Sequence, residues 1–250
     1  MPLDAPARPL RMTAPDLRLP PPFTAVRLRE LGDAFEHACT TAAETGAGTL
    51  VHVGRFDLAE FALVLEPDEP LKGARRAFYA GMAALADALS AHAQPETLIE
   101  IHWPGALTVN LGLVGGGRLA WPADAAEDAV PDWLVFGGMI RTATMLTDPG
   151  LTPNVTALSE EGFGETSAAD VIESFARNMM MHLDAWQEKG FGVVAKSYLE
   201  RLAGAGLRSI SDDGDLLARR AGARASERSA LVPALAHQDW YDPVGKGPRT

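Results

Sequence analysis

The feature that most constrains the fold is a repeated change in the spacing of hydrophobic residues along the chain. Helical spacing marks residues 26–45, 71–93, 168–188 and 193–203. Short runs rich in β-branched and other apolar residues lie between them, at 49–53, 58–65, 98–103, 106–114, 118–121 and 133–142. This order predicts an α+β fold: a mainly antiparallel mixed sheet with packed helices, plus a small C-terminal β appendage.

Proline and glycine positions predict how this pattern divides into domains. Residues 1–23 contain seven prolines and are expected to form an extended N-terminal arm. Residues 24–204 are expected to form the main domain, with a long surface loop at 148–167. Residues 205–250 are expected to form the β appendage, with a tight turn at Asp212, Asp213 and Gly214, and a loose polar tail from Gln238 onward.

Composition limits the possible partners and location. The chain has 250 residues, of which 47% are hydrophobic, which is enough for a full core. Its formal net charge of −11 argues against nucleic acid or an anionic membrane as the main partner, because both require clustered cations. No apolar run is typical of a membrane span or a secretory signal, and Cys39 is the only cysteine. A cytoplasmic location is therefore expected.

Few residues have the spacing of a metal site or a nucleophile. No arrangement of histidines and acids resembles a zinc signature, so no metal is expected. His182 lies on the apolar stripe of a predicted helix and is interpreted as a core residue. Cys39 also falls within a predicted helix, where a cysteine is usually a small core residue.

One ordered set of motifs resembles a known family. Residues 99–110 read Ile-Glu-Ile-His-Trp-Pro-Gly-Ala-Leu-Thr-Val-Asn, a helix precedes them, and Gly116-Gly117-Arg118-Leu119-Ala120 follows. Further on, the run 133–138 ends in paired glycines. Together these resemble the central strands of the biotin and lipoate protein ligase family, from about residue 26 to residue 202.

The resemblance implies a chemistry and a set of partners. Ligases of this family join a vitamin carboxylate to ATP and pass the acyl group to a lysine of a carrier protein. The resemblance thus implies a small carboxylate or acyl ligand, an acyl-carrier or biotinyl/lipoyl carrier protein as partner, and, if the activity is retained, ATP with biotin or lipoate. The candidate catalytic residues are His102 and Arg118. The candidate ligand-binding residues are Arg55, Trp103, Pro104, Gly105, Asn110, Gly116, Gly117, Gly137 and Gly138.

The chain departs from the family pattern at the positions that carry positive charge. His102 and Arg118 stand where the family has lysines, and Arg118 can hold a carboxylate bidentately whereas His102 is charged only part of the time near neutral pH. Only Gly54 and Arg55 correspond to the family's glycine-arginine loop, in a short link. The octanoyl transferase branch uses no ATP but relies on a cysteine, here Cys39. Two hypotheses follow: an acyl ligase or transferase, or a catalytically silent module that binds an acyl group or a carrier domain. A weaker third is a scaffold that binds a protein partner through its sheet edge and appendage.

Overall fold

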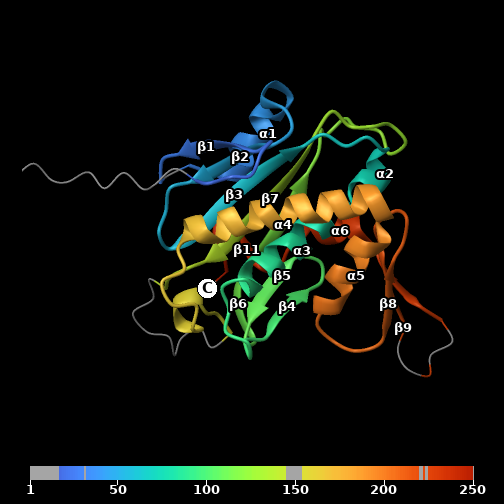
Figure 1. Ribbon diagram of the computed structural model, residues 1–250. Helices are drawn as coiled ribbons and strands as arrows, with labels where there is room; N and C mark the ends of the chain where they lie inside the picture. Colours follow the sequence, from blue (N-terminus) through green and yellow to red (C-terminus); the bar gives the residue numbers. More distant parts are fainter. Residues whose placement is uncertain (1–16, 31, 145–153, 220–221, 223–224, 250) are drawn as a thin grey trace, which may run out of the picture.

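A seven-stranded sheet organises the structure, a computed structural model that describes residues 17–30, 32–144, 154–219, 222 and 225–249 (Figure 1). Its strands are β1 (Thr24–Leu28), β2 (Thr49–Val53), β3 (Leu58–Leu65), β4 (Ile99–His102), β5 (Ala106–Val109), β6 (Gly112–Ala120) and β7 (Leu134–Arg141). They lie in the order β1-β2-β3-β7-β6-β5-β4. The β1–β2 pair is parallel and the others are antiparallel. The predicted α+β fold with a mainly antiparallel mixed sheet is confirmed.

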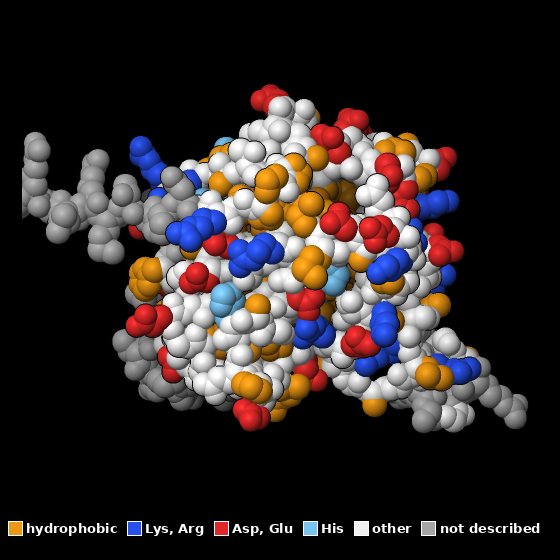
Figure 2. Space-filling view, viewed as in Figure 1, with side chains coloured by type: hydrophobic (Ala, Val, Ile, Leu, Met, Phe, Trp, Pro, Cys, Tyr) orange, Lys and Arg blue, Asp and Glu red, His pale blue; other side chains and the backbone are white. Residues whose placement is uncertain are grey.

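Helix α3 (Ala77–Ser90) forms a middle layer between the sheet and two outer helices, α4 (Ala168–Lys189) and α5 (Gly192–Arg201) (Figure 1). All of its residues except Asp87 and Ser90 are buried. A helix that is apolar on nearly every side must be covered on every side. In contrast, the outer surface seen in Figure 2 carries basic side chains interspersed with acidic ones. No helix among the described residues is both long and apolar enough to cross a membrane.

Two glycines allow the helical layer to pack closely on the sheet. A Cβ atom at Gly117 would lie 2.5 Å from the sulfur of Met82. A Cβ atom at Gly138 would lie 2.5 Å from Cζ of Phe61. The ring of Phe61 in turn lies 4.4 Å, between centroids, from the ring of Phe175 on α4. The space beside these two glycines, which the resemblance assigned to a ligand, is filled here by side chains of the same chain.

Replacing Gly138 with alanine tests this packing. The added methyl group would push against the ring of Phe61, and overpacking of a core costs about 1–3 kcal/mol of unfolding free energy. We expect Gly138→Ala to lower the midpoint of thermal unfolding. Gly192→Ala is the matched control, because a Cβ atom at Gly192 would meet no atom within 4 Å. Equal midpoints for the two variants would contradict the packing role.

An ion cluster joins the three helices on their common surface. Asp87 on α3 accepts a hydrogen bond from His182 on α4, with Oδ2 and Nε2 2.8 Å apart. Its other oxygen accepts from the guanidinium of Arg201 on α5. Burial opposes ionisation of Asp87, but the hydrogen bond from His182 and the charge of Arg201 outweigh it and hold the pKa below its ordinary value. His182 is therefore bonded within the helical layer, as a structural residue of the packed helices.

This cluster predicts a loss of stability in acid. Because the folded pKa of Asp87 is depressed, its contribution is fully present above the unfolded value, about pH 3.9, and is lost as the pH falls through the folded value. We expect Asp87→Asn to lower the unfolding midpoint at pH 7. The gap between the variant and the unaltered protein should shrink below about pH 4. A gap of the same size at pH 3 and pH 7, measured by circular dichroism, would refute this electrostatic role.

Several predicted helix and strand bounds were wrong. One cause is that the apolar residues of a segment can fit both helical and strand spacing. The helix expected at 26–45 begins only at Ala34, as α1 (Ala34–Thr45), because Asp33 caps it by accepting a hydrogen bond from the amide of Glu36. The residues before it form β1, which pairs with β2. The helix expected at 71–93 is divided into α2 (Leu71–Ala74) and α3. The glycine triplet does not interrupt a strand, because β6 runs through it and the break falls instead at Asn110 and Leu111, which have positive φ.

The C-terminal part contains the predicted small sheet and two elements that were not predicted. Strands β8 (Leu207–Ile210), β9 (Leu216–Arg219) and β10 (Glu227–Ser229) form that sheet. Helix α6 (Leu231–Ala236) and a hairpin of β11 (Tyr241–Asp242) and β12 (Gly247–Pro248) follow. The prediction of a loose tail after Gln238 was wrong, because Trp240 is only 2% exposed. Its indole is buried against the sheet beside Leu58 and Met139, and we call residues 237–249 the C-terminal segment.

Two further predictions fall largely on residues that are not described. Most of the expected N-terminal arm, residues 1–16, lies outside the described chain, as does the first part of the loop at 148–167. The end of the arm packs on the core through Leu17, Leu19 and Phe23. The rest of the loop contains a short 3-10 helix, η2 (Leu158–Glu160).

Candidate functional site

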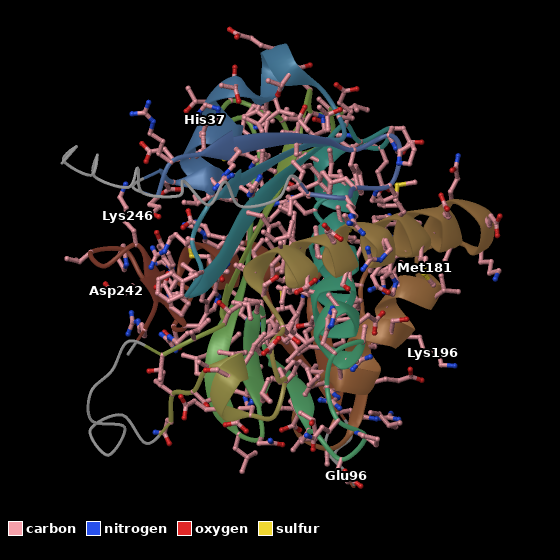
Figure 3. The ribbon with its side chains drawn as sticks, turned by 60° about the vertical axis from the view of Figure 1, so that its left-hand side comes forward. His37, Glu96, Met181, Lys196, Asp242 and Lys246 are labelled. Carbon is pink, nitrogen blue, oxygen red and sulfur yellow. The ribbon has the colours of Figure 1, made fainter. Side chains whose placement is uncertain are left out.

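The face of the sheet turned away from α3 carries the candidate site. Helix α1 covers one part of this face and the C-terminal segment covers another. In Figure 3, α4 and α5 lie to the right of the sheet, whereas Asp242 and Lys246 of the C-terminal segment lie to the left. Lys246 extends toward α1, where its Nζ lies 3.3 Å from a carboxylate oxygen of Glu36. Two segments far apart in sequence thus meet over one sheet face.

Two more glycines allow aromatic rings to approach this face closely. A Cβ atom at Gly137 would lie 2.4 Å from Cδ2 of Phe35, which α1 supplies. A Cβ atom at Gly116 would lie 2.6 Å from Cε2 of Trp240, which the C-terminal segment supplies. The absence of side chains at these positions therefore serves close approach, as the glycines suggested, but in this structure the approaching groups belong to the same chain.

Arg118 is the side chain on this face with the clearest capacity to bind an anion. Its guanidinium carbon lies 4.3 Å from the ring centroid of Phe35 and 4.2 Å from that of Tyr241. These two cation–π contacts restrict where the guanidinium can lie. Its Nη2 atom is buried and has no hydrogen-bond partner among the described residues. A guanidinium restricted in this way, with an unused buried donor, is a site for a carboxylate or a phosphate.

A cavity of about 460 Å³ opens beside Arg118. A second cation, Arg249, lines it, and the Nε of Arg249 donates to the carbonyl oxygen of Tyr241 over 3.2 Å. The cavity also has an acidic wall residue, Asp239. The full lining consists of Phe35, Arg118, Leu119, Leu235, Ala236, His237, Gln238, Asp239, Tyr241, Pro243 and Arg249. The C-terminal segment therefore supplies most of the wall.

The Trp-Pro motif is held on the helical side. The ring of Trp103 stacks on that of Tyr79 of α3, with centroids 6.1 Å apart, and the carbonyl oxygen of Pro104 accepts a hydrogen bond of 2.7 Å from the hydroxyl of Tyr198 of α5. Gly105 leaves no room for a side chain, because a Cβ atom there would lie 2.7 Å from Cζ of Phe78. His102 is exposed at the end of β4. This motif contributes no side chain to the described lining of the Arg118 cavity.

Asn110 and Arg55 have partners of their own. Asn110 sits in the turn between β5 and β6, where its amide donates to a carboxylate oxygen of Glu161 over 2.7 Å. Arg55 binds Asp57 through two hydrogen bonds, of 3.1 and 2.7 Å, and the hydrogen bond lowers the pKa of Asp57. Only residues 54–57 separate β2 from β3, so the link is as short as the sequence indicated. The roles assigned to both residues in ligand binding remain predictions.

Sequence reasoning missed the aromatic residues around Arg118 and a buried acid near α1. Phe35 and Tyr241 clamp the guanidinium, yet one lay in a predicted core helix and the other in a predicted loose tail. Glu60 on β3 is 3% exposed and accepts a hydrogen bond of 3.0 Å from the amide of Ala34 at the start of α1. Burial raises its pKa. A single acid inside the apolar run of β3 was the available signal for this residue.

The described residues contain no cluster of three or more histidine, cysteine, aspartate or glutamate side chains placed to hold a metal ion. The candidate site is built mainly from Arg118 and Arg249, the rings of Phe35 and Tyr241, and Asp239.

Solved structures share this architecture. A biotin protein ligase-like protein of unknown function from a Silicibacter species is 28% identical, with a TM-score of 0.77 over 89% of this chain and 100% of that one. Biotin protein ligase from Aquifex aeolicus is 16% identical, with a TM-score of 0.64 over 84% and 96% of the two chains. Biotin protein ligase from Leishmania major, solved with biotinyl-5-AMP, is 16% identical, with a TM-score of 0.54 over 84% and 99%.

The sequence itself identifies the family. No protein with a curated description matches it significantly. Residues 19–200, however, match the profile of the biotin/lipoate A/B protein ligase family, and these residues include the main sheet, its helices and Arg118. The chain therefore belongs to the biotin/lipoate A/B protein ligase family.

Proposed function

We propose that this protein binds a small carboxylate or acyl ligand at Arg118 and acts in the attachment or transfer of an acyl group to a carrier protein. The observation that carries the proposal is the buried Nη2 of Arg118, which faces no acceptor among the described residues. Leaving a buried charged donor without an acceptor is costly, so a bound anion would stabilise the site. Family membership supports the acyl chemistry and the carrier partner.

The geometry around Arg118 favours a planar acid. Phe35 and Tyr241 both contact the guanidinium through their rings, so neither of them takes up one of its N–H donors. A carboxylate can accept two parallel N–H bonds from a guanidinium. The cavity of about 460 Å³, within the usual range for small-ligand sites, gives a short acid, or the carboxylate end of a longer one, access to Arg118.

The cavity offers poor support for a nucleotide triphosphate. Its described lining has two arginines, Arg118 and Arg249, together with Asp239. Arg55, in the link that corresponds to the family's glycine-arginine loop, is already paired with Asp57. A triphosphate requires several cations and backbone donors aimed at its oxygens. The residues present therefore do not fit ATP, and no adenylation step is derived for this chain.

Calorimetric titration with biotin, lipoate, octanoate and ATP, singly and in pairs, tests the ligand class. We expect an acid to bind without ATP. Arg118→Ala should weaken that binding about 10- to 100-fold, because hydrogen bonds to a charged group contribute about 1.5–3 kcal/mol. Arg118→Lys should retain part of the affinity, since it keeps the charge but not the bidentate edge.

Arg177→Ala is the control, because Arg177 lies on α4 and is half exposed. Acid binding that survives in Arg118→Ala at full affinity would place the ligand elsewhere. Binding of an acid only together with ATP would restore the ligase mechanism.

A second candidate is a catalytically silent module that binds an acyl group or a carrier domain. Two observations favour it: the family's lysine positions hold His102 and Arg118, and the β2–β3 link is too short to cover a bound adenylate. An acyl-transfer assay with a carrier domain separates the two candidates. Transfer of an acyl group from an acid with ATP, or from a thioester, supports the enzyme. Acid or carrier binding without transfer supports the module.

The cytoplasmic location remains a prediction.

Cys39 does not have the properties of a nucleophile for thioester chemistry. It lies within α1, and burial raises the pKa of its thiol to about 11, although the charge of Arg118 acts in the opposite direction. The thiolate is the reactive form, and raising the pKa from 9.0 to about 11 lowers its fraction about a hundredfold at neutral pH.

We therefore expect slow alkylation of Cys39 by iodoacetamide. At pH 7.5 the folded protein should react at least about a hundredfold more slowly than the same protein in denaturant, as followed by mass spectrometry. Cys39→Ala should bind acids as the unaltered protein does. Rapid alkylation of the folded protein, together with loss of acid binding in Cys39→Ala, would show that Cys39 takes part in the binding site.

A further inference from the structure

The strongest unexplained feature is the position of Trp240. Its side chain is 2% exposed and packs on Leu58 of β3 and Met139 of β7, with Ala106 and Leu113 at the edge of the contact. Gly116 gives it access to the backbone of β6. Trp240 thus fills an apolar area of the sheet face that the main domain itself leaves uncovered.

The contact of Trp240 with the sheet is apolar. The indole Nε1–H donates to the side-chain oxygen of Gln238, two residues earlier in the same segment. Its backbone oxygen accepts a hydrogen bond of 2.8 Å from the amide of Arg249, also in the segment. Since the polar groups of Trp240 are satisfied within the segment, a hydrocarbon group could take the place of the indole without leaving a polar group of the sheet unpaired.

The apolar area adjoins the anion-binding group. Tyr241 follows Trp240 directly in the chain and stacks on the guanidinium of Arg118. Gly116, beneath Trp240, lies two residues before Arg118 on the same strand and therefore on the same face of the sheet. An apolar area beside a cation matches a straight-chain carboxylic acid, with its carboxylate on Arg118 and its hydrocarbon where Trp240 now lies.

The attachment of the C-terminal segment is compatible with its release. Strands β11 and β12 pair with each other and with no strand of the main sheet in the described chain. Arg141 donates to the carbonyl oxygens of Pro248 and Arg249 over 3.1 and 3.3 Å. Lys246, 59% exposed, contacts Asp33 and Glu36 on α1, and exposed ion pairs contribute little. Release would therefore break no strand pairing of the main sheet.

We propose that the C-terminal segment is an intramolecular plug: Trp240 occupies the hydrocarbon part of an acyl-ligand site, and a medium-chain acid binds when the segment leaves the sheet. The carboxylate then takes the place of Tyr241 beside Arg118, which keeps its contact with Phe35. This inference rests on the proposed function, because it takes Arg118 as the carboxylate-binding group. It adds a regulatory element, since acid binding and segment docking exclude each other. An agent that stabilises the docked segment would lower the affinity of the protein for the acid. By the same linkage, bound acid would destabilise the docked segment.

The test compares octanoate binding to full-length variants by calorimetry. We expect Trp240→Ala to bind octanoate at least tenfold more tightly than the unaltered protein, because the acid no longer has to displace the indole. Adding Arg118→Ala should remove this binding. Trp186→Ala, which removes an indole from α4 on the opposite side of the sheet, should leave the affinity for octanoate unchanged. Octan-1-ol should bind Trp240→Ala much more weakly than octanoate.

Hydrogen exchange on the unaltered protein gives an independent readout that does not depend on how well a variant folds. Saturating octanoate should speed exchange of the amides of Tyr241 and Arg249, which are hydrogen bonded within the docked segment. Unchanged or slower exchange with octanoate bound would show that the segment is a permanent wall and would overturn the plug.

The calorimetric outcomes separate the two proposals. Arg118-dependent octanoate binding that is no tighter in Trp240→Ala would leave the acid site standing and overturn the plug. Equal binding of octanol and octanoate by Trp240→Ala would show that the ligands only fill the cavity created by the mutation. That result would also overturn the plug. No binding of octanoate to either protein would overturn both the plug and the proposed carboxylate site.

Discussion

The burial of α3 is the constraint on which the rest of the structure depends. This helix is apolar on nearly every side, so it is stable only between the sheet and the outer helices α4 and α5. Its packing on the sheet brings Met82 over Gly117, and on the same face Phe61 lies over Gly138, so side chains of the chain fill the space beside both glycines. Arg118 lies on the opposite face.

That opposite face has one group suited to bind an anion, Arg118, and next to it an apolar surface that is already buried by Trp240. Arg118 contacts two rings and has an unused buried donor, which is typical of a group prepared for an anion. The neighbouring apolar surface, however, is covered by Trp240 of the same chain. Arg118 therefore borders a cavity, whereas the apolar surface next to it is filled. Trp240 and Tyr241 lie outside the residues that match the family profile, so the surroundings of Arg118 are not set by those residues alone.

Family membership and site chemistry give different information about this protein. The profile match establishes membership of the family, but a fold supports many activities and function depends on the side chains at the site. In this chain His102 is exposed at the end of β4, and Arg118 contacts two aromatic rings. Trp103 and Pro104 have structural contacts, with α3 and α5 respectively. The chain thus has the fold of the family, and these side chains define what the site can bind.

The sequence by itself determined those elements whose signals are local. Strands β2 and β3 have the predicted bounds because short apolar runs there are flanked by glycine and proline, and α4 begins after a capping residue, Ser167. The family was also predictable, because its short motifs follow one another along the chain in a set order. Tertiary structure decided the division between β1 and α1, since residues 26 and 28 fit both helical and strand spacing until β2 pairs with them. It also decided the environment of Arg118. Phe35 and Tyr241 are far from Arg118 in sequence and reach it only after the sheet forms, and Trp240 is buried only because that folded sheet offers it an apolar surface.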